Sequence, residues 1–172
     1  MRSVRRLALH ALGVLAMALA LPLAFAQPAS ADVTIAVRTV YYDASRAGEF
    51  VNTVHEAARV WNANVTNVRL VAGTPATITV YVDNGWPRAY VQGLGRGRWY
   101  MGRQAVNQGY YPLRIATHEF GHLLGLPDRR TGLCSDLMSG SSAPVSCRNA
   151  TPSSRERAEV NANFAGSLAL AA

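Results

Sequence analysis

Two histidines and a glutamate stand together at His118, Glu119 and His122, in the order His-Glu-x-x-His. On a helix, residues four apart lie on one face, one turn from each other, so both imidazoles can reach a single metal ion. Glu119 directly follows the first histidine and is expected near the same cleft, set back from the ion. This pattern is typical of a zinc site at which a carboxylate takes a proton from an activated water during hydrolysis.

A third protein ligand is expected, because a catalytic zinc ion normally has three protein ligands and one open position. Asp128 is the candidate, since it follows Gly125, where the chain can reverse, and Pro127, which stiffens the approach. A second hypothesis has Asp128 capping the loop, with Glu156 or Glu159 from a later helix as the third ligand. A third is a zinc-binding module without catalysis, although Glu119 argues against it because binding alone needs no base.

The elements that position these residues follow from their periodicity. A helix over residues 112–125 is expected to carry the two histidines, with Pro112 in its first turn and Gly125 at its end. Ser45 is expected to cap an earlier helix that runs to about Trp61. The other expected elements are strands over 33–41, 66–71, 76–82 and 98–101, a short segment over 88–92, a glycine-punctuated loop over 93–97, a long loop over 126–151 and a last helix over about 151–164. The order predicts one α/β (α+β) domain built on a single sheet.

The first 31 residues differ from the rest and predict a secretory signal peptide. Three arginines precede an almost continuous apolar run over residues 7–21, and small residues follow it. Cleavage is expected after Ala26 or Ala31, which leaves a peptidase domain over residues 32–172. An uncleaved membrane anchor is the alternative, because the apolar run is long.

Charge and cysteine content restrict the possible partners. The formal charge of +7 falls to +4 once the three arginines of the signal are removed, and the chain has no lysine and no basic run. This favours a solvated surface over a nucleic-acid interface. Cys134 and Cys147 are expected to form a disulfide, as isolated pairs usually do in exported chains, with two buried thiols as the alternative.

Met138 lies ten residues past Asp128 and is followed by turn residues. The extended motif together with this methionine resembles the metzincin clan of metallopeptidases, and its Asp-terminated variant, HExxHxxGxxD, resembles the snapalysin family of small secreted neutral peptidases. The resemblance covers essentially the whole mature chain. Besides the metal motif, the residues that carry the resemblance are 61–62, 95–97, 134–147, 155–157 and 160–162.

The resemblance implies a metzincin-like domain with a twisted, mostly parallel sheet, an antiparallel edge strand, about three helices, and a turn carrying Met138 under the zinc. It implies a secreted, extracellular endopeptidase that acts as a monomer on protein or peptide substrates, without nucleic acid and without a membrane anchor after signal cleavage. An edge strand would pair with the extended substrate, and the strand at 98–101 is the candidate. The family prefers an aromatic residue just after the scissile bond.

The sequence departs from the family pattern at two places. Family members bind calcium through an Asp and a Thr just before the active-site helix, where this chain has Tyr111 and Leu113. Neither side chain offers the oxygen ligand that calcium prefers, so no calcium ion is expected there. Family members also have His-Tyr after the ligand Asp, where this chain has Arg129 and Arg130. We expect these two arginines to be a solvated surface pair.

Overall fold

The computed structural model describes residues 36–165, and these residues form one compact unit. The predicted signal peptide and the first residues of the strand expected at 33–41 lie outside the described residues. Within residues 36–165, no helix combines the length and the apolar character that crossing a membrane requires.

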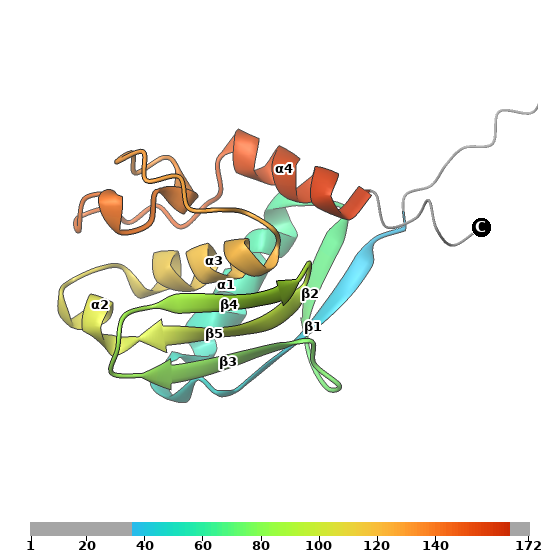
Figure 1. Cartoon of the computed structure of the whole chain (residues 1–172), viewed down its shortest axis with the longest axis horizontal. Coiled ribbons are helices and arrows are strands. Elements are labelled where there is room, and N and C mark those ends of the chain that lie inside the picture. The colour runs from blue at the N-terminus through green and yellow to red at the C-terminus, as the bar shows by residue number, and fades with distance from the viewer. Residues whose placement is uncertain (1–35, 166–172) are drawn as a thin grey trace, which may run out of the picture. The chain divides into compact units, whose positions relative to one another are not determined.

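The domain is built on one five-stranded sheet in the order β2-β1-β3-β5-β4 (Figure 1). Four strands run parallel to their neighbours, while β4 pairs with β5 in the antiparallel direction. The bounds are Arg38–Arg46 for β1, Val68–Ala72 for β2, Ile78–Asp83 for β3, Arg88–Gly93 for β4 and Arg96–Gly102 for β5. The expectation of a mostly parallel sheet with an antiparallel edge strand is therefore confirmed.

The expectation that residues 98–101 form the substrate-pairing edge is wrong. These residues belong to β5, which is hydrogen-bonded to β3 on one side and to β4 on the other. The loop expected over 93–97 is in fact a tight hairpin between β4 and β5, in which Gly95 turns the chain at a φ of +71°. A side chain at Gly95 would also meet Val40, with its Cβ 2.8 Å from Cγ2, so the turn requires glycine for two reasons. The edge strands are β4, next to β5, and β2 at the other end of the sheet.

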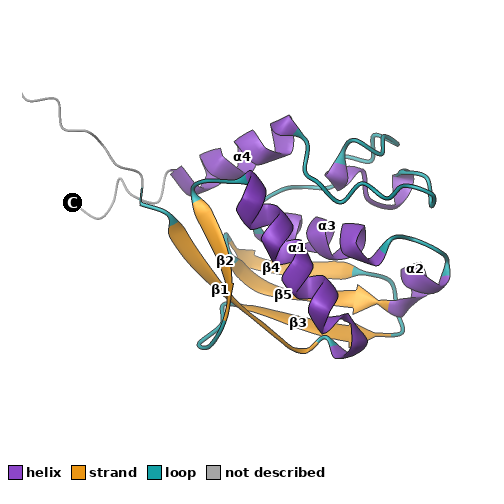
Figure 2. Cartoon of the chain, turned by 180° about the vertical axis from the view of Figure 1, so that it is seen from behind, coloured by secondary structure: helices purple, strands orange, loops and turns teal. Residues whose placement is uncertain are grey.

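The helices gather on one face of the sheet (Figure 2). Their bounds are Val51–Asn64 for α1, Arg103–Asn107 for α2, Pro112–Leu123 for α3 and Ser154–Ala165 for α4, with 3-10 turns η1 at Gly48–Phe50 and η2 at Leu137–Ser142. The expected cap at Ser45 is wrong, because β1 continues through it and its backbone N–H bonds to Asp43 within the strand. The short helix α2 and the turn η2 were not expected from the sequence.

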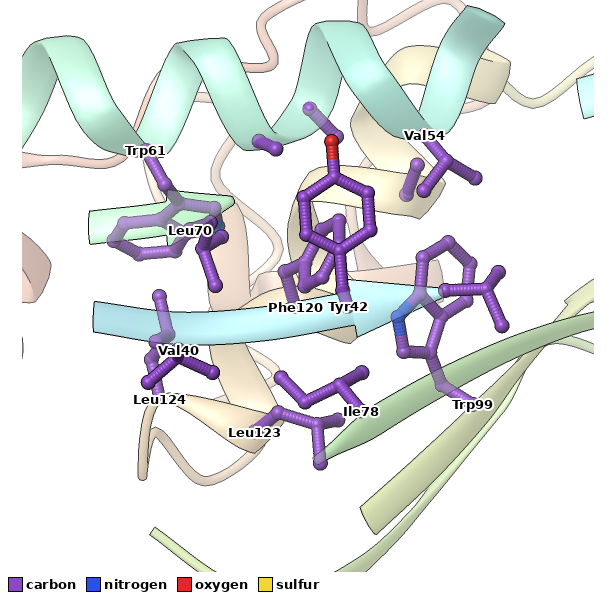
Figure 3. Packing of buried hydrophobic residues seen from close by; sticks show 14 of the residues in the cluster. Val40, Tyr42, Val54, Trp61, Leu70, Ile78, Trp99, Phe120, Leu123 and Leu124 are labelled. Atoms are coloured by element: carbon purple, nitrogen blue, oxygen red, sulfur yellow. The ribbon is translucent and has the colours of Figure 1, made fainter. Parts of the chain in front are cut away.

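The core between α1, α3 and the sheet fixes the rotation of α3 (Figure 3). Phe120 of α3 packs edge-on between the rings of Tyr42 and Trp99, at centroid distances of 5.4 and 5.2 Å. Trp61 of α1 is fully buried and donates its indole N–H to the Thr117 carbonyl at 2.9 Å. Because this face of α3 faces the core, the histidine face is directed to the other side.

Candidate metal centre and active-site cleft

Each of the two histidines of α3 has a backbone carbonyl at its Nδ1 atom. Nδ1 of His118 lies 3.0 Å from the Leu137 carbonyl, and Nδ1 of His122 lies 2.9 Å from the Leu126 carbonyl. A carbonyl only accepts, so both Nδ1 atoms carry a proton, and in the neutral form of each ring Nε2 is the nitrogen with the lone pair. This is the tautomer that a metal-binding histidine needs, with the second ring nitrogen held by a fixed partner.

Asp128 reaches the same point after the chain reverses. Gly125 ends α3 in the left-handed region at a φ of +93°, and the Leu126 N–H then donates back to the Gly121 carbonyl at 2.9 Å. As a result, Oδ1 of Asp128 lies 3.2 Å from Nε2 of His118 and 3.6 Å from Nε2 of His122.

These three residues satisfy a simple test for a bound cation. Their ligand atoms all lie within 4.8 Å of one another. The two Nε2 atoms lie 3.1 Å from each other, and both lie within 3.6 Å of Oδ1 of Asp128, so one cation could contact all three atoms. Two imidazoles and one carboxylate are a donor set that suits zinc and leaves one position open. The residues therefore fit the metal that the family implies.

The pair Arg129-Arg130 is not the solvated surface pair that we expected. Arg130 is exposed, but its Nη2 donates to Oδ2 of Asp128 at 2.9 Å, so the two oxygens of this carboxylate face different partners. The side chain of Arg129 is only 11% exposed and forms an ion pair with Glu159. The Arg129 N–H also donates to the Met138 carbonyl at 2.8 Å, which ties the Asp128 segment to the methionine turn.

Met138 lies in a buried turn against the middle of α3. A Cβ added to Gly121 would lie 2.7 Å from the Met138 sulfur, so only glycine allows this close approach. Glu156 of α4 is fully buried and accepts the N–H groups of Leu137 and Met138 at 3.2 and 2.6 Å. The turn is thus held between α3 and α4, and its Leu137 carbonyl in turn orients His118.

The two glutamates considered as alternative third ligands are engaged elsewhere. Glu156 binds backbone N–H groups with both carboxylate oxygens, and Glu159 pairs with Arg129. Within residues 36–165, the group of histidine, cysteine and acidic side chains able to share an ion comprises His118, His122 and Asp128. The arrangement therefore favours Asp128 over either glutamate.

A disulfide between Cys134 and Cys147 closes the loop that contains Met138, as expected. Sequence reasoning missed Arg114, whose buried guanidinium donates to the Cys134, Asp136 and Asn149 carbonyls at 3.1, 2.6 and 2.6 Å. Its spacing was the available signal, because Arg114 precedes His118 by one helical turn and so lies on the same face. Arg114 thus binds the loop to α3.

Glu119 lies beside the metal ligands at the wall of a cavity of about 440 Å³. The residue is 4% exposed, and within the described chain its Oε2 has no hydrogen-bond partner. Burial raises the pKa of the Glu119 carboxyl to about 7, while the charges of His118 and Arg88 oppose this rise. A buried carboxyl with a free oxygen and a pKa near neutrality is suited to exchange protons with a water.

The cavity is a cleft between β4, α3 and the methionine turn. The β4 side includes Trp86, Arg88 and Val91, and the α3 side includes Tyr111 and Ile115. The β4 residues were not singled out from the sequence, because only the tertiary structure brings this edge strand beside α3. Polar and apolar side chains therefore line one continuous groove that runs past Glu119.

The positions that correspond to the family's calcium ligands hold side chains with other contacts. The Tyr111 ring lies under the Arg148 guanidinium, 5.9 Å from the ring centroid. Leu113 is partly buried and packs against the hydrophobic core. The expectation that no calcium binds here stays a prediction.

Comparisons with known proteins identify the family of this chain. Residues 36–167 match the model of the Streptomyces extracellular neutral proteinase (M7) family. The chain is 44% identical over 128 residues to an extracellular small neutral protease of Streptomyces caespitosus, and this match covers 74% of the chain and 97% of the relative. It is 42% identical to a protein of the same description from Streptomyces sp. strain C5, where the match covers 77% of the chain and 59% of the relative.

Among solved structures, the chain is similar to high choriolytic enzyme 1, a hatching enzyme zinc-protease from the medaka Oryzias latipes. The TM-score is 0.42 at 25% identity, and the match covers 67% of this chain and 60% of that one. The family match spans all of the described residues, and both relatives exceed 40% identity. The chain therefore belongs to the Streptomyces extracellular neutral proteinase (M7) family, a family of metalloendopeptidases.

Proposed function

We propose that this protein is a secreted, extracellular endopeptidase that binds one zinc ion through His118, His122 and Asp128 and uses Glu119 as its general base. One observation carries the proposal: three ligand atoms meet beside a buried carboxylate that has a free oxygen, at the wall of an open cleft. The family and the extracellular relatives support the same conclusion.

Zinc at this position would polarise the scissile carbonyl and make an attacking water more acidic. Glu119 then takes the proton of that water as it attacks the carbonyl carbon. The protonated Glu119 afterwards gives this proton to the leaving amine, so a single side chain serves as base and then as acid. Its burial, which raises its pKa above the ordinary value of a glutamate, keeps bulk water from competing for the proton.

The substrate is proposed to add as an extended strand along β4. This strand is antiparallel to β5, forms the edge of the sheet and lines the cleft. Backbone hydrogen bonds to a strand edge hold a peptide regardless of its sequence, which suits an enzyme that degrades many proteins. The aromatic preference that the family resemblance implies is part of this proposal, and Tyr111 and Ile115 supply an apolar wall beside the metal ligands.

A casein digest with and without a chelator tests the proposal. Cleavage is expected to stop when the zinc is removed and to return when one equivalent of zinc per chain is added back. Zinc content, measured by mass spectrometry on the same samples, must follow activity. A protein that binds zinc tightly but never cleaves casein or a mixed peptide library would be a binding module instead.

A further inference from the structure

The face of the sheet opposite the helices carries a ladder of arginines and tyrosines. Strand pairing places Arg46 of β1 beside Tyr81 of β3, Tyr81 beside Tyr100 of β5, and Tyr100 beside Arg88 of β4. Val80, Trp99 and Met101, which alternate with these residues, are buried in the core. Because neighbouring residues of a strand point to opposite faces, the ladder lies on the outward face and crosses four strands, β1, β3, β5 and β4.

The tyrosine rings in the ladder are covered by their neighbours. Tyr81 and Tyr100 stack on each other at a centroid distance of 5.1 Å. Arg46 lies over the Tyr81 ring, at 5.4 Å from its centroid, and Arg88 lies over the Tyr100 ring, at 4.1 Å. Each of the two stacked rings thus also contacts a guanidinium group, which holds that group in place at the surface.

A second row extends the ladder by two residues along the strands. Arg98 of β5 pairs in register with Tyr90 of β4, and its guanidinium lies 4.8 Å from the centre of that ring. Arg98 and Tyr90 are both exposed. The two rows together present Arg46, Arg88 and Arg98 on one open surface, which we call the arginine ladder.

Two of these three arginines form no ion pair within residues 36–165, although the charge of Asp43 acts on Arg46. Arg88 pairs with Asp83, but Arg46 and Arg98 form no ion pair with any described acidic group. Asp43, the acidic residue in the same rows, accepts a hydrogen bond from the Ser45 backbone. The outward face is therefore a preorganised cationic surface with spare donor capacity.

The chemistry of this surface selects its partner. Nucleic-acid bases and sugar rings bind proteins by stacking on open aromatic faces, whereas each tyrosine of the ladder already has a guanidinium over its ring. Carboxylates need no ring face, because they bind the fixed fork of a guanidinium directly. An extended chain with repeated carboxylates, such as an Asp- or Glu-rich polypeptide segment, matches guanidinium groups spaced across neighbouring strands.

The ladder is continuous with the catalytic cleft. Arg88 belongs to the ladder and also lines the cavity. Strand β4 therefore forms a wall of the cleft and also carries the ladder residues at the edge of the sheet. We propose that the arginine ladder is an exosite that binds an acidic segment of the protein substrate next to the cleaved sequence. This inference rests on the proposed peptidase function, and it adds a preferred substrate class, proteins with acidic stretches near the scissile bond.

The test compares two substrates that share one cleavage sequence. One has a tail of alternating Glu and Gly, and the other has a tail of alternating Gln and Gly. The tail is placed on either side of the scissile bond in separate versions. With the zinc-loaded enzyme at low salt, KM for one Glu-tailed version is expected to be about tenfold lower than for its Gln-tailed partner, with kcat unchanged. Added salt is expected to remove most of this difference.

The variant Arg46→Gln/Arg98→Gln is expected to abolish the tail preference and to leave cleavage of the Gln-tailed substrate unchanged. The matched control, Arg59→Gln/Arg155→Gln, removes the same charge from exposed positions on α1 and α4 and should keep the preference. A labelled Glu-Gly peptide without a cleavage site, titrated into zinc-loaded Glu119→Gln protein, measures binding apart from catalysis. Melting temperatures of all variants check that the sheet is intact.

The possible failures are distinguishable. If neither substrate is cleaved, the proposed function fails, while the titration still reports on the ladder. Equal KM values for both tails at low salt, or a preference that survives in Arg46→Gln/Arg98→Gln, overturn the exosite. Single-stranded DNA or polyphosphate competing as strongly as the Glu-Gly peptide would overturn the assignment to acidic polypeptides.

Discussion

Glu156 and Met138 are joined by a buried hydrogen bond in which the carboxylate Oε1 accepts the Met138 N–H at 2.6 Å. The other oxygen accepts the N–H groups of Leu137 and Ser153. Through Leu137, whose carbonyl contacts Nδ1 of His118 at 3.0 Å, α4 helps to fix a proposed metal ligand on α3. A fully buried carboxylate thus serves the site by positioning the turn beneath it.

We predict that Glu156→Gln lowers the free energy of unfolding by about 2 kcal/mol, because an amide group can accept at only one of the two oxygen positions. Urea unfolding measures this loss, and zinc titration should show weaker binding as the turn loosens. The control Glu56→Gln changes the same group at an exposed position of α1 and should unfold like the parent. Unchanged stability in Glu156→Gln would contradict this role.

We predict that Glu119→Gln keeps one zinc ion per chain and loses between about a hundredfold and ten-thousandfold in kcat. Glutamine has almost the same shape, but it cannot accept the proton of the attacking water. Zinc content and casein cleavage are measured on one preparation. Near-normal cleavage in this variant would mean that another group is the base.

We predict that Asp128→Ala loses most of its zinc affinity, because only the two imidazoles remain. Competition with a chromogenic chelator gives the dissociation constant. Glu159→Ala is the matched comparison, since it removes a carboxylate that pairs with Arg129 and does not face the histidines. If Asp128→Ala held zinc normally while Glu159→Ala released it, the ligand assignment would have to be reversed.

We predict a smaller effect for Arg130→Gln, about a tenfold loss of zinc affinity, the size expected when a partner of a ligand is removed. The Arg130 guanidinium holds Oδ2 of Asp128, so without it the carboxylate has more freedom to turn away from the histidines. Arg148→Gln serves as a control because that guanidinium lies over Tyr111 and not on Asp128. Equal affinities of the two variants would show that Asp128 needs no such partner.

We predict that Cys134→Ser/Cys147→Ser lowers the free energy of unfolding by about 3 kcal/mol, since the bridge closes a loop with a sequence separation of 13. Arg114 still binds the carbonyls of this loop, so residual zinc binding is expected in the variant. Unfolding in urea with and without a reductant gives the same comparison on the parent protein. No difference between the two conditions would contradict the prediction.

Local patterns were enough to predict much of the site. The spacing of His118 and His122 follows from the helical repeat alone, and the glycine after them predicts where the helix ends. The resemblance to the snapalysin family, carried by the extended motif, is confirmed by the family match. The parallel sheet with an antiparallel edge was also predicted, while the extent of β1 and the hairpin at Gly95 were not.

Contacts between distant segments decided the rest. Arg129 looks like a solvated residue in the sequence, yet it is buried because α4 brings Glu159 to it from 30 residues away. The identity of the edge strand depends on the order in which strands pair, and local propensity carries no information about that order. The arginine ladder likewise exists only because four strands align in register.

The sequence by itself determined which residues can bind a metal and move a proton, because those properties follow from side-chain chemistry and helical spacing. Only the tertiary structure decided what holds each of them in place, because burial and partner choice depend on the packing of segments far apart in the chain.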